Sequence, residues 1–263
     1  MPRLYRKIRQ ILRLLGAAVF SFPNSACAPK ASIVEKGVGP GHIVMLPGVE
    51  GNAWQLSGVK QGLRDAGLDW TIEIIPWGSP PFHSLVNLTD LPANLKRADR
   101  IAARLAELCR EKPDAKLVLV GYSGGGGLAM LTVNVLPDDL MLDRIVLVAG
   151  AISNDYDTSK AERHCRDTLV NIYSPRDGIV GWGTSVFGTI DRKKVISAGH
   201  SGFVDASGRV RESPKLLQIG WNESWQQYGH GGSHVCYLYR EWAKHVLAKA
   251  ICPGVGSNAD RAD

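Results

Sequence analysis

The sequence predicts a three-layer α/β/α fold with a mostly parallel, doubly wound sheet flanked by helices. Short runs of Val, Ile and Leu alternate along the chain with segments whose apolar residues recur at helical spacing. The run at 116–120, KLVLV, has no polar face, which is typical of a central parallel strand covered by helices on both sides. Strands separated by helices imply right-handed crossovers, and therefore parallel pairing.

Each element follows from its local pattern. We expect strands at 42–46, 70–77, 116–120, 143–150, 168–174 and 215–221. A helix carries Leu56 to Ala66 after a turn at PGVEGN, and a second runs from Leu95 to Lys112, where Pro113 ends it. A third helix follows at 126–136, and a last one places Leu238, Trp242 and Val246 on one face.

A chain of 263 residues suits one α/β domain. We expect a signal-like segment and linker at 1–39, an α/β domain at 40–252, and a flexible tail at 253–263 with the sequence PGVGSNADRAD.

The formal net charge of +6 is concentrated at the N-terminus. Five cations and no acidic residue precede Cys27, so the rest of the chain is close to +1, and there Lys and Arg alternate with Asp and Glu. A polyanion requires a clustered basic surface, so the sequence predicts no nucleic-acid partner.

The basic start is followed by the apolar run LLGAAVFSF and by small residues before Cys27. This order is typical of a secretory signal and predicts an exported protein, periplasmic or anchored to a membrane through a lipidated Cys27. Asn24 stands where a lipoprotein signal usually has an aliphatic residue. The run is too short to span a bilayer as a mature helix. The alternative is an N-terminal amphipathic arm on a cytoplasmic protein.

The other cysteines, Cys109, Cys165, Cys236 and Cys252, are widely spaced and form no C-x-x-C pair. They predict neither a zinc site nor a redox site, and we assign no disulfide. We expect no metal and no cofactor.

Residues 121–125, GYSGG, fit G-x-S-x-G between a buried strand and a helix. Such a turn forces the serine into a strained backbone conformation, lifts its hydroxyl above the sheet edge and aims the N-terminus of the next helix at it. We therefore predict that Ser123 is a nucleophile. The alternatives are a glycine-rich packing turn and a phosphate-binding loop, although the latter usually ends in Lys-Ser or Lys-Thr.

A serine needs a base and an acid, each on a loop after a later strand. Asp177, in PRDGIV, is the predicted acid. Alternatively, Asp177 is a turn-forming aspartate before glycine. Asp155 and Asp157 are the next candidates for the acid. The loop YGHGGSHVCYL offers two bases. We predict that His234 is the base, with His230 as the alternative.

The oxyanion hole should combine the backbone N–H of Gly124 with that of Val49, in the early loop LPGVEG. Gly48 lets the backbone approach the substrate there. Glu50 is an alternative donor position, and its carboxylate is expected to point away from a developing anion.

Over residues 40–250 the chain resembles the α/β-hydrolase superfamily, through LPGVEG, GYSGGG, SPRDGIV and GHGGSH in the order Ser, Asp, His. More narrowly, it is similar to uncharacterised exported bacterial serine hydrolases of esterase or lipase type. The resemblance implies an eight-stranded sheet, metal-free catalysis through an acyl-enzyme, and a base after a Gly-Gly pair, as at His234. Two departures are Pro47-Gly48, where many members have His-Gly, and the serine between Gly-Gly and His234.

The predicted function is a serine hydrolase, carboxylesterase- or lipase-like, that cleaves esters of a small-molecule acyl substrate with Ser123, His234 and Asp177. Amide, thioester and lactone substrates are alternatives, as is a catalytically inactive binding protein with the same fold. No long insertion separates the strands at 143–150 and 168–174, so we expect no large lid. Trp182 and Phe187 either line the mouth of the pocket or pack in the core.

Overall fold

The computed structural model describes residues 31–78 and 84–255. In this part of the chain the strands form one sheet in the order β1-β3-β2-β4-β5-β6-β7, in which β1 pairs antiparallel with β3 and all other neighbours are parallel. The strands are β1 (Ile33–Glu35), β2 (Gly41–Leu46), β3 (Thr71–Ile74), β4 (Lys116–Tyr122), β5 (Arg144–Val148), β6 (Leu169–Tyr173) and β7 (Leu216–Gly220).

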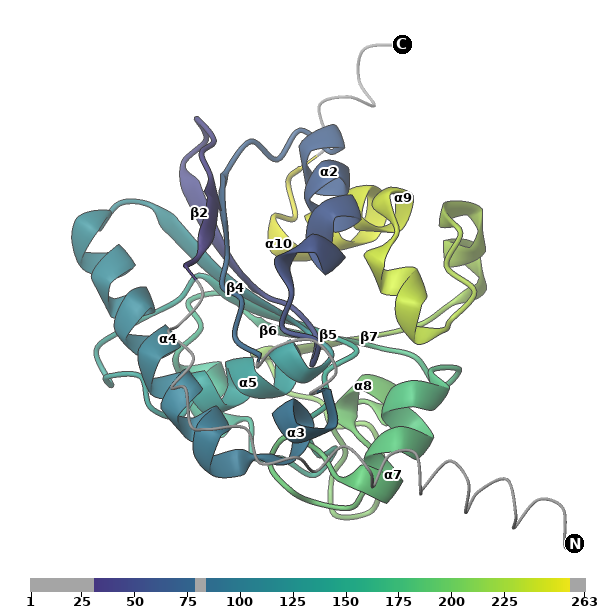
Figure 1. The fold of residues 1–263 in the computed structure, drawn as a ribbon. Helices are drawn as coiled ribbons and strands as arrows, with labels where there is room; N and C mark the ends of the chain where they lie inside the picture. Colours follow the sequence, from purple (N-terminus) through teal and green to yellow (C-terminus); the bar gives the residue numbers. More distant parts are fainter. Residues whose placement is uncertain (1–30, 79–83, 256–263) are drawn as a thin grey trace, which may run out of the picture.

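Helices cover both faces of this sheet, as Figure 1 shows, with α4 and α5 on one face and α2, α9 and α10 on the other. The predicted three-layer fold is therefore confirmed. The helices are α2 (Ser57–Asp65), α3 (Ser84–Thr89), α4 (Leu91–Glu111), α5 (Gly124–Val133), α6 (Ser159–Arg163), α7 (Thr184–Phe187), α8 (Ala198–Ser201), α9 (Arg240–Trp242) and α10 (Ala248–Ile251). The 3₁₀ turns are η1 (Ala53–Leu56), η3 (Glu223–Tyr228) and η4 (His234–Leu238), and the π-helical turns are η2 (Ile179–Gly183) and η5 (Ala243–Leu247).

Strand β4 lies at the centre of the sheet, between β2 and β5, and is buried from Leu117 to Tyr122. A strand buried on both faces needs an apolar residue at every position, which is the pattern of KLVLV. Because parallel strands end at the same edge, the loops after β2, β4 and β6 all reach the carboxyl edge of the sheet.

Helix α4 begins at Leu91, four residues before the start that its apolar spacing predicts. Asp90 caps it by accepting a hydrogen bond from the backbone N–H of Ala93 at 3.1 Å, and Pro92 occupies the first turn, where no N–H is needed. Capping by side chains thus extends the helix beyond its apolar stripe.

The sheet differs from the sequence prediction in where it begins and in its number of strands. Strand β1 pairs with β3 inside the segment expected to be a linker, so the sheet begins before residue 40. The described residues hold seven strands rather than eight. Strand β1 gives no sequence signal because it is three residues long and lies at the edge, with Ile33 and Val34 about half exposed.

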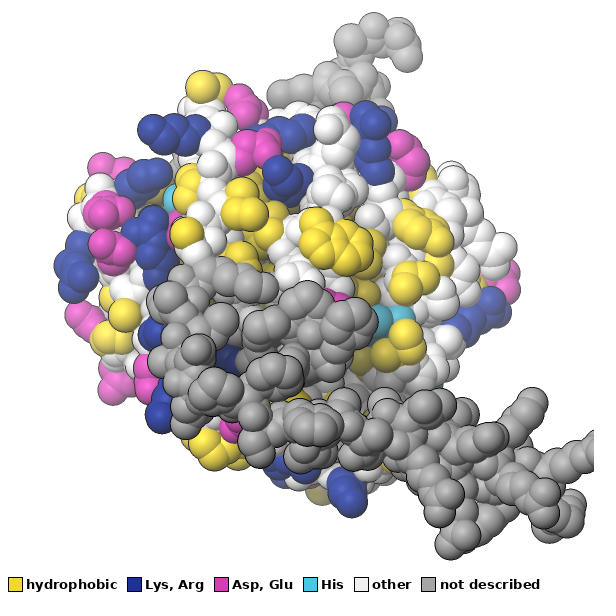
Figure 2. All heavy atoms as spheres, viewed as in Figure 1, with side chains coloured by type: hydrophobic (Ala, Val, Ile, Leu, Met, Phe, Trp, Pro, Cys, Tyr) yellow, Lys and Arg dark blue, Asp and Glu magenta, His cyan; other side chains and the backbone are white. Residues whose placement is uncertain are grey.

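The predicted signal segment, Cys27 and most of the predicted tail lie outside the described residues. In the part that the structure describes, no helix is long and apolar enough to cross a membrane. Cys109, Cys165, Cys236 and Cys252 are free thiols. Figure 2 shows Lys and Arg side chains interspersed with Asp and Glu around α2 and α4, so the two signs are mixed on that part of the face in view.

Candidate functional site

The turn between β4 and α5 holds Ser123 in a strained conformation, with φ 55° and ψ −122°. A positive φ with this ψ lies outside the regions that non-glycine residues normally occupy, so its surroundings must impose it. The backbone N–H of Ser123 donates to the carbonyl of Val148 at 2.9 Å, and its own carbonyl accepts from Gly126 and Ala151, each at 2.9 Å. These bonds fix the hydroxyl at the carboxyl edge of the sheet.

The glycines on either side of Ser123 are required by space. A Cβ on Gly121 would lie 2.5 Å from the carbonyl oxygen of Gly125, and a Cβ on Gly125 would lie 2.2 Å from that of Leu46. Both contacts are with backbone, which cannot rotate away. The two glycines of the motif therefore allow α5 to start directly against β2 and β4.

His234 joins Ser123 to Asp177 by two hydrogen bonds. Its Nε2 lies 2.8 Å from Ser123 Oγ, and its Nδ1 lies 2.6 Å from Asp177 Oδ2. All three residues are buried, with Asp177 fully so. The Asp177 carboxylate accepts the Nδ1 proton, which leaves the Nε2 lone pair to accept the serine hydroxyl. The structure thus brings together the three side chains that the sequence singled out.

The loop after β6 holds Asp177 in place. Its Oδ1 accepts from the backbone N–H groups of Ile179 at 3.1 Å and Val180 at 3.3 Å, at the start of η2. Its backbone carbonyl lies 3.0 Å from Nδ1 of His200. The two backbone N–H groups satisfy Oδ1 of the buried carboxylate and leave Oδ2 free for His234.

Tyr122 contacts His234 in two ways that the sequence did not indicate. The two rings are stacked, with centroids 5.1 Å apart, and the phenol donates to the backbone carbonyl of His234 at 3.1 Å. Burial raises the pKa of the Tyr122 phenol well above its usual value, so the group remains a neutral donor.

His230, the alternative base, lies elsewhere. Its ring is fully buried among Trp225, Tyr237 and Trp242, with the Tyr237 ring centroid 4.3 Å away. Its Nδ1 accepts from the backbone N–H of Gly232 at 3.2 Å, and burial lowers its pKa to about 4. The histidine that contacts Ser123 is therefore His234, and His230 packs beneath the same loop.

The loop after β2 lies against the serine turn. A Cβ on Gly124 would be 3.2 Å from the backbone nitrogen of Val49, and one on Gly48 would be 3.5 Å from Cβ of Ser123. The backbone of Val49 thus lies beside Gly124, and that of Gly48 lies beside Ser123. The carboxylate of Glu50 accepts a hydrogen bond from Ser84 at the start of α3.

Searches with the sequence find no matching family model and no matching curated protein. Solved structures do match. TT1662 from Thermus thermophilus aligns over 82% of this chain and 90% of its own, with 14% identity and a TM-score of 0.51. A hormone-sensitive lipase from a metagenome library aligns over 84% of this chain and 80% of its own, with 15% identity and a TM-score of 0.50. The chain has the α/β-hydrolase fold.

Within the α/β-hydrolase fold, the runner-up acids have other roles. Asp155 pairs with Lys193 at 2.8 Å, and Asp157 accepts from the backbone N–H of Ser159 at 2.9 Å. Trp182 and Phe187 are 71% and 45% exposed, so neither belongs to the core.

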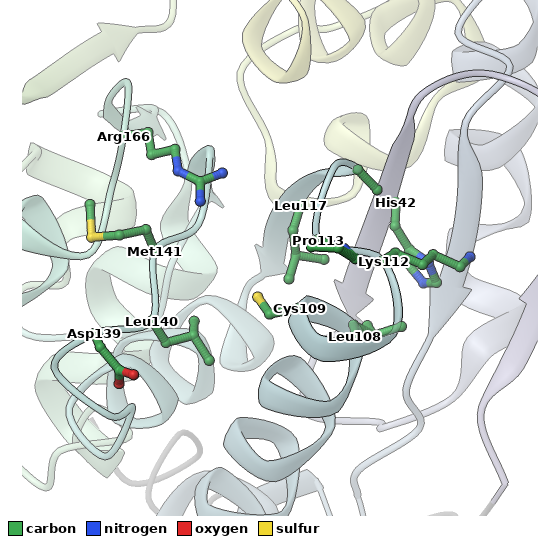
Figure 3. A pocket seen from close by; sticks show the side chains of 11 residues that line it. His42, Leu108, Cys109, Lys112, Pro113, Leu117, Asp139, Leu140, Met141 and Arg166 are labelled. Carbon is green, nitrogen blue, oxygen red and sulfur yellow. The ribbon is translucent and has the colours of Figure 1, made fainter.

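A separate cavity of about 200 Å³ lies at the opposite edge of the hydrolase sheet (Figure 3). Cys109, Leu117 and Leu140 are among the residues that line it. Because Leu117 is near the start of β4 and Ser123 follows its end, the two sites are roughly 20 Å apart at ~3.3 Å per residue. No group of three His, Cys, Asp or Glu side chains in the described residues is arranged to hold a metal.

Proposed function

We propose that the chain is a serine hydrolase that cleaves carboxylic esters through an acyl-enzyme. The observation that carries the proposal is the continuous hydrogen-bonded chain from Ser123 through His234 to Asp177, on a strained turn beside two backbone donors. A packing turn would not need a buried imidazole aligned between a hydroxyl and a carboxylate.

In the acylation step, Ser123 Oγ attacks the ester carbonyl carbon while its proton passes to Nε2 of His234. The carbonyl oxygen takes up the negative charge and accepts from the N–H groups of Val49 and Gly124. Asp177 stabilises the imidazolium. When the tetrahedral adduct collapses, the C–O bond to the alcohol breaks and His234 returns the proton to the leaving oxygen.

In the deacylation step, water replaces the alcohol. His234 takes a proton from the water as its oxygen attacks the acyl carbon, and the second tetrahedral adduct expels Ser123 Oγ, which recovers the proton. The products are a carboxylic acid and the regenerated serine.

The side chains that flank the acid and the base favour an apolar acyl group. Ile179, Trp182 and Val235 are each more than half exposed. Ile179 and Trp182 lie two and five residues after Asp177, and Val235 directly follows His234. Figure 2 shows hydrophobic side chains gathered in the middle of the face in view. A small or medium acyl chain is our expectation, since binding it would cover apolar surface that water now contacts.

An alkyl fluorophosphonate probe tests the proposal directly. Ser123 Oγ should attack phosphorus with loss of fluoride, and labelling should disappear in Ser123→Ala while the variant remains folded. Hydrolysis of a p-nitrophenyl ester series from acetate to palmitate then gives the acyl preference. A folded wild-type protein that is neither labelled nor active would refute the proposal.

Export, with Cys27 as a membrane anchor, is a further part of the proposal and rests on the N-terminal pattern alone. Expression in a bacterial host should give a membrane-associated, palmitate-labelled protein, and Cys27→Ser should remove the label. Unlabelled protein in the cytoplasmic fraction would contradict it.

A further inference from the structure

We propose that Asn87 and Trp77 are positioning residues: they hold the peptide units on either side of the Gly48–Val49 peptide and so keep its N–H toward Ser123. The inference rests on the proposed function, because that N–H matters only where an oxyanion forms. It concerns the polar groups behind the loop after β2, rather than the serine, histidine and aspartate themselves.

Three consecutive carbonyl groups of this loop are each held by a donor. The indole Nε1 of Trp77 donates to the carbonyl of Pro47 at 2.7 Å. The backbone N–H of Gly51 donates to the carbonyl of Gly48, also at 2.7 Å. The side-chain amide of Asn87 donates to the carbonyl of Val49 at 2.8 Å.

These bonds decide which way the Val49 N–H points. The carbonyl of Gly48 and the N–H of Val49 belong to one trans peptide unit and point in opposite directions. With the carbonyl bonded to Gly51, the N–H points the opposite way, and the Val49 nitrogen lies close to Gly124. A rotated peptide would instead present a carbonyl oxygen to the developing anion and would repel it.

Asn87 is itself held on both sides. Its Oδ1 accepts from the guanidinium of Arg97 at 3.3 Å, and its backbone carbonyl accepts from Asn94 at 2.8 Å. Arg97 also donates to Asn94 Oδ1 at 2.6 Å and lies 5.6 Å from the centroid of the Trp77 ring. Asn87, Asn94 and Trp77 are at most 6% exposed. Helix α4 therefore supports α3, and α3 supports the loop.

The test is Asn87→Asp, which has the same shape and keeps the acceptor for Arg97 but replaces the donor to Val49 with a lone pair. With p-nitrophenyl butyrate we expect kcat to fall about tenfold to a hundredfold, since loss of a whole oxyanion donor costs about 10²–10³. KM should stay unchanged, because substrate binding is not altered. In Asn87→Ala, which adds no charge, the pH at which kcat/KM rises should also stay unchanged, because the surroundings of His234 keep their charge. Affinity for an alkyl boronic acid, which forms a tetrahedral adduct, should fall by the same factor as kcat.

Asn87→Ala should also lower kcat and boronate affinity. Thr89→Val, on the same helix, is the matched control and should leave kcat within twofold of the wild type. Trp77→Phe removes the donor to the Pro47 carbonyl and keeps an aromatic ring. It tests the same positioning of the loop after β2 if both Asn87 variants unfold below the assay temperature. Folded variants with wild-type kcat and boronate affinity would overturn the inference. An inactive, unlabelled wild type would instead overturn the proposed function.

Discussion

The phenol oxygen of Tyr122 lies 3.1 Å from the backbone carbonyl oxygen of His234, while the two rings are stacked 5.1 Å apart. One residue of the turn that carries the nucleophile thus holds both the ring and the backbone of the base. Since Tyr122 and His234 are 112 residues apart in sequence, this contact couples two elements that local structure alone could not align.

We predict that the hydrogen bond and the ring stacking between Tyr122 and His234 each contribute to kcat. Tyr122→Phe removes the hydrogen bond and keeps the stacked ring, and should lower kcat about threefold to tenfold, corresponding to about 1 kcal/mol for one hydrogen bond. Tyr122→Leu also removes the ring and should lower kcat further. Steady-state hydrolysis of p-nitrophenyl butyrate measures both, and equal activity of the two variants would show that the ring contact has no effect.

Asp177→Asn should lower kcat by about 10³–10⁴, because an amide can donate to Nδ1 and so favour the tautomer that carries its proton on Nε2. That tautomer cannot accept the serine proton. Fluorophosphonate labelling should slow by a similar factor, while the fold stays intact by circular dichroism. Asp155→Asn, in the exposed pair with Lys193, is the control and should leave labelling unchanged.

His230 should make stability depend on pH. Burial lowers its pKa in the folded protein to about 4, against about 6.5 in the unfolded chain, so the unfolded state binds more protons between these values. The contribution of neutral His230 to the free energy of unfolding is fully present above pH 6.5 and is lost as the pH falls toward 4.

Urea unfolding at pH 7.0 and pH 4.5 measures this effect. Between pH 7.0 and pH 4.5 the free energy of unfolding of the wild type should fall by on the order of 2 kcal/mol more than that of His230→Gln. If His230→Gln loses as much stability as the wild type, His230 does not titrate in this window.

The sequence could predict the central elements because each signal there is local. The apolar run of β4, the glycines around Ser123 and the loop positions of Asp177 and His234 all follow from short patterns. Strand β1 could not be predicted, since its three residues form a strand only by pairing with β3. The early start of α4 depends on Asp90 and Pro92, which lie outside its apolar pattern.

The sequence leaves the choice of base between His230 and His234 open for a physical reason. Both lie in one glycine-rich loop, and only tertiary contacts distinguish them. His230 packs against Trp225, Tyr237 and Trp242. His234 instead contacts Ser123 and Asp177. The roles of Tyr122, Trp77 and Asn87 likewise arise from contacts between segments distant in sequence. An aromatic side chain in G-x-S-x-G or an asparagine in a short helix gives no signal of its own.

Gly125→Ala should destabilise the fold, although the change adds one methyl group. That methyl would lie 2.2 Å from the carbonyl oxygen of Leu46 and 2.4 Å from that of Pro47, so α5 or β2 must move. Overpacking of this kind costs about 1–3 kcal/mol, and the displaced loop also carries Val49, so activity should fall as well. Gly231→Ala is the matched control, because a Cβ there meets nothing within 4 Å and its φ is not in the left-handed region. Thermal and urea unfolding should separate the two variants clearly, and equal stability would mean that the turn can relax without moving its neighbours.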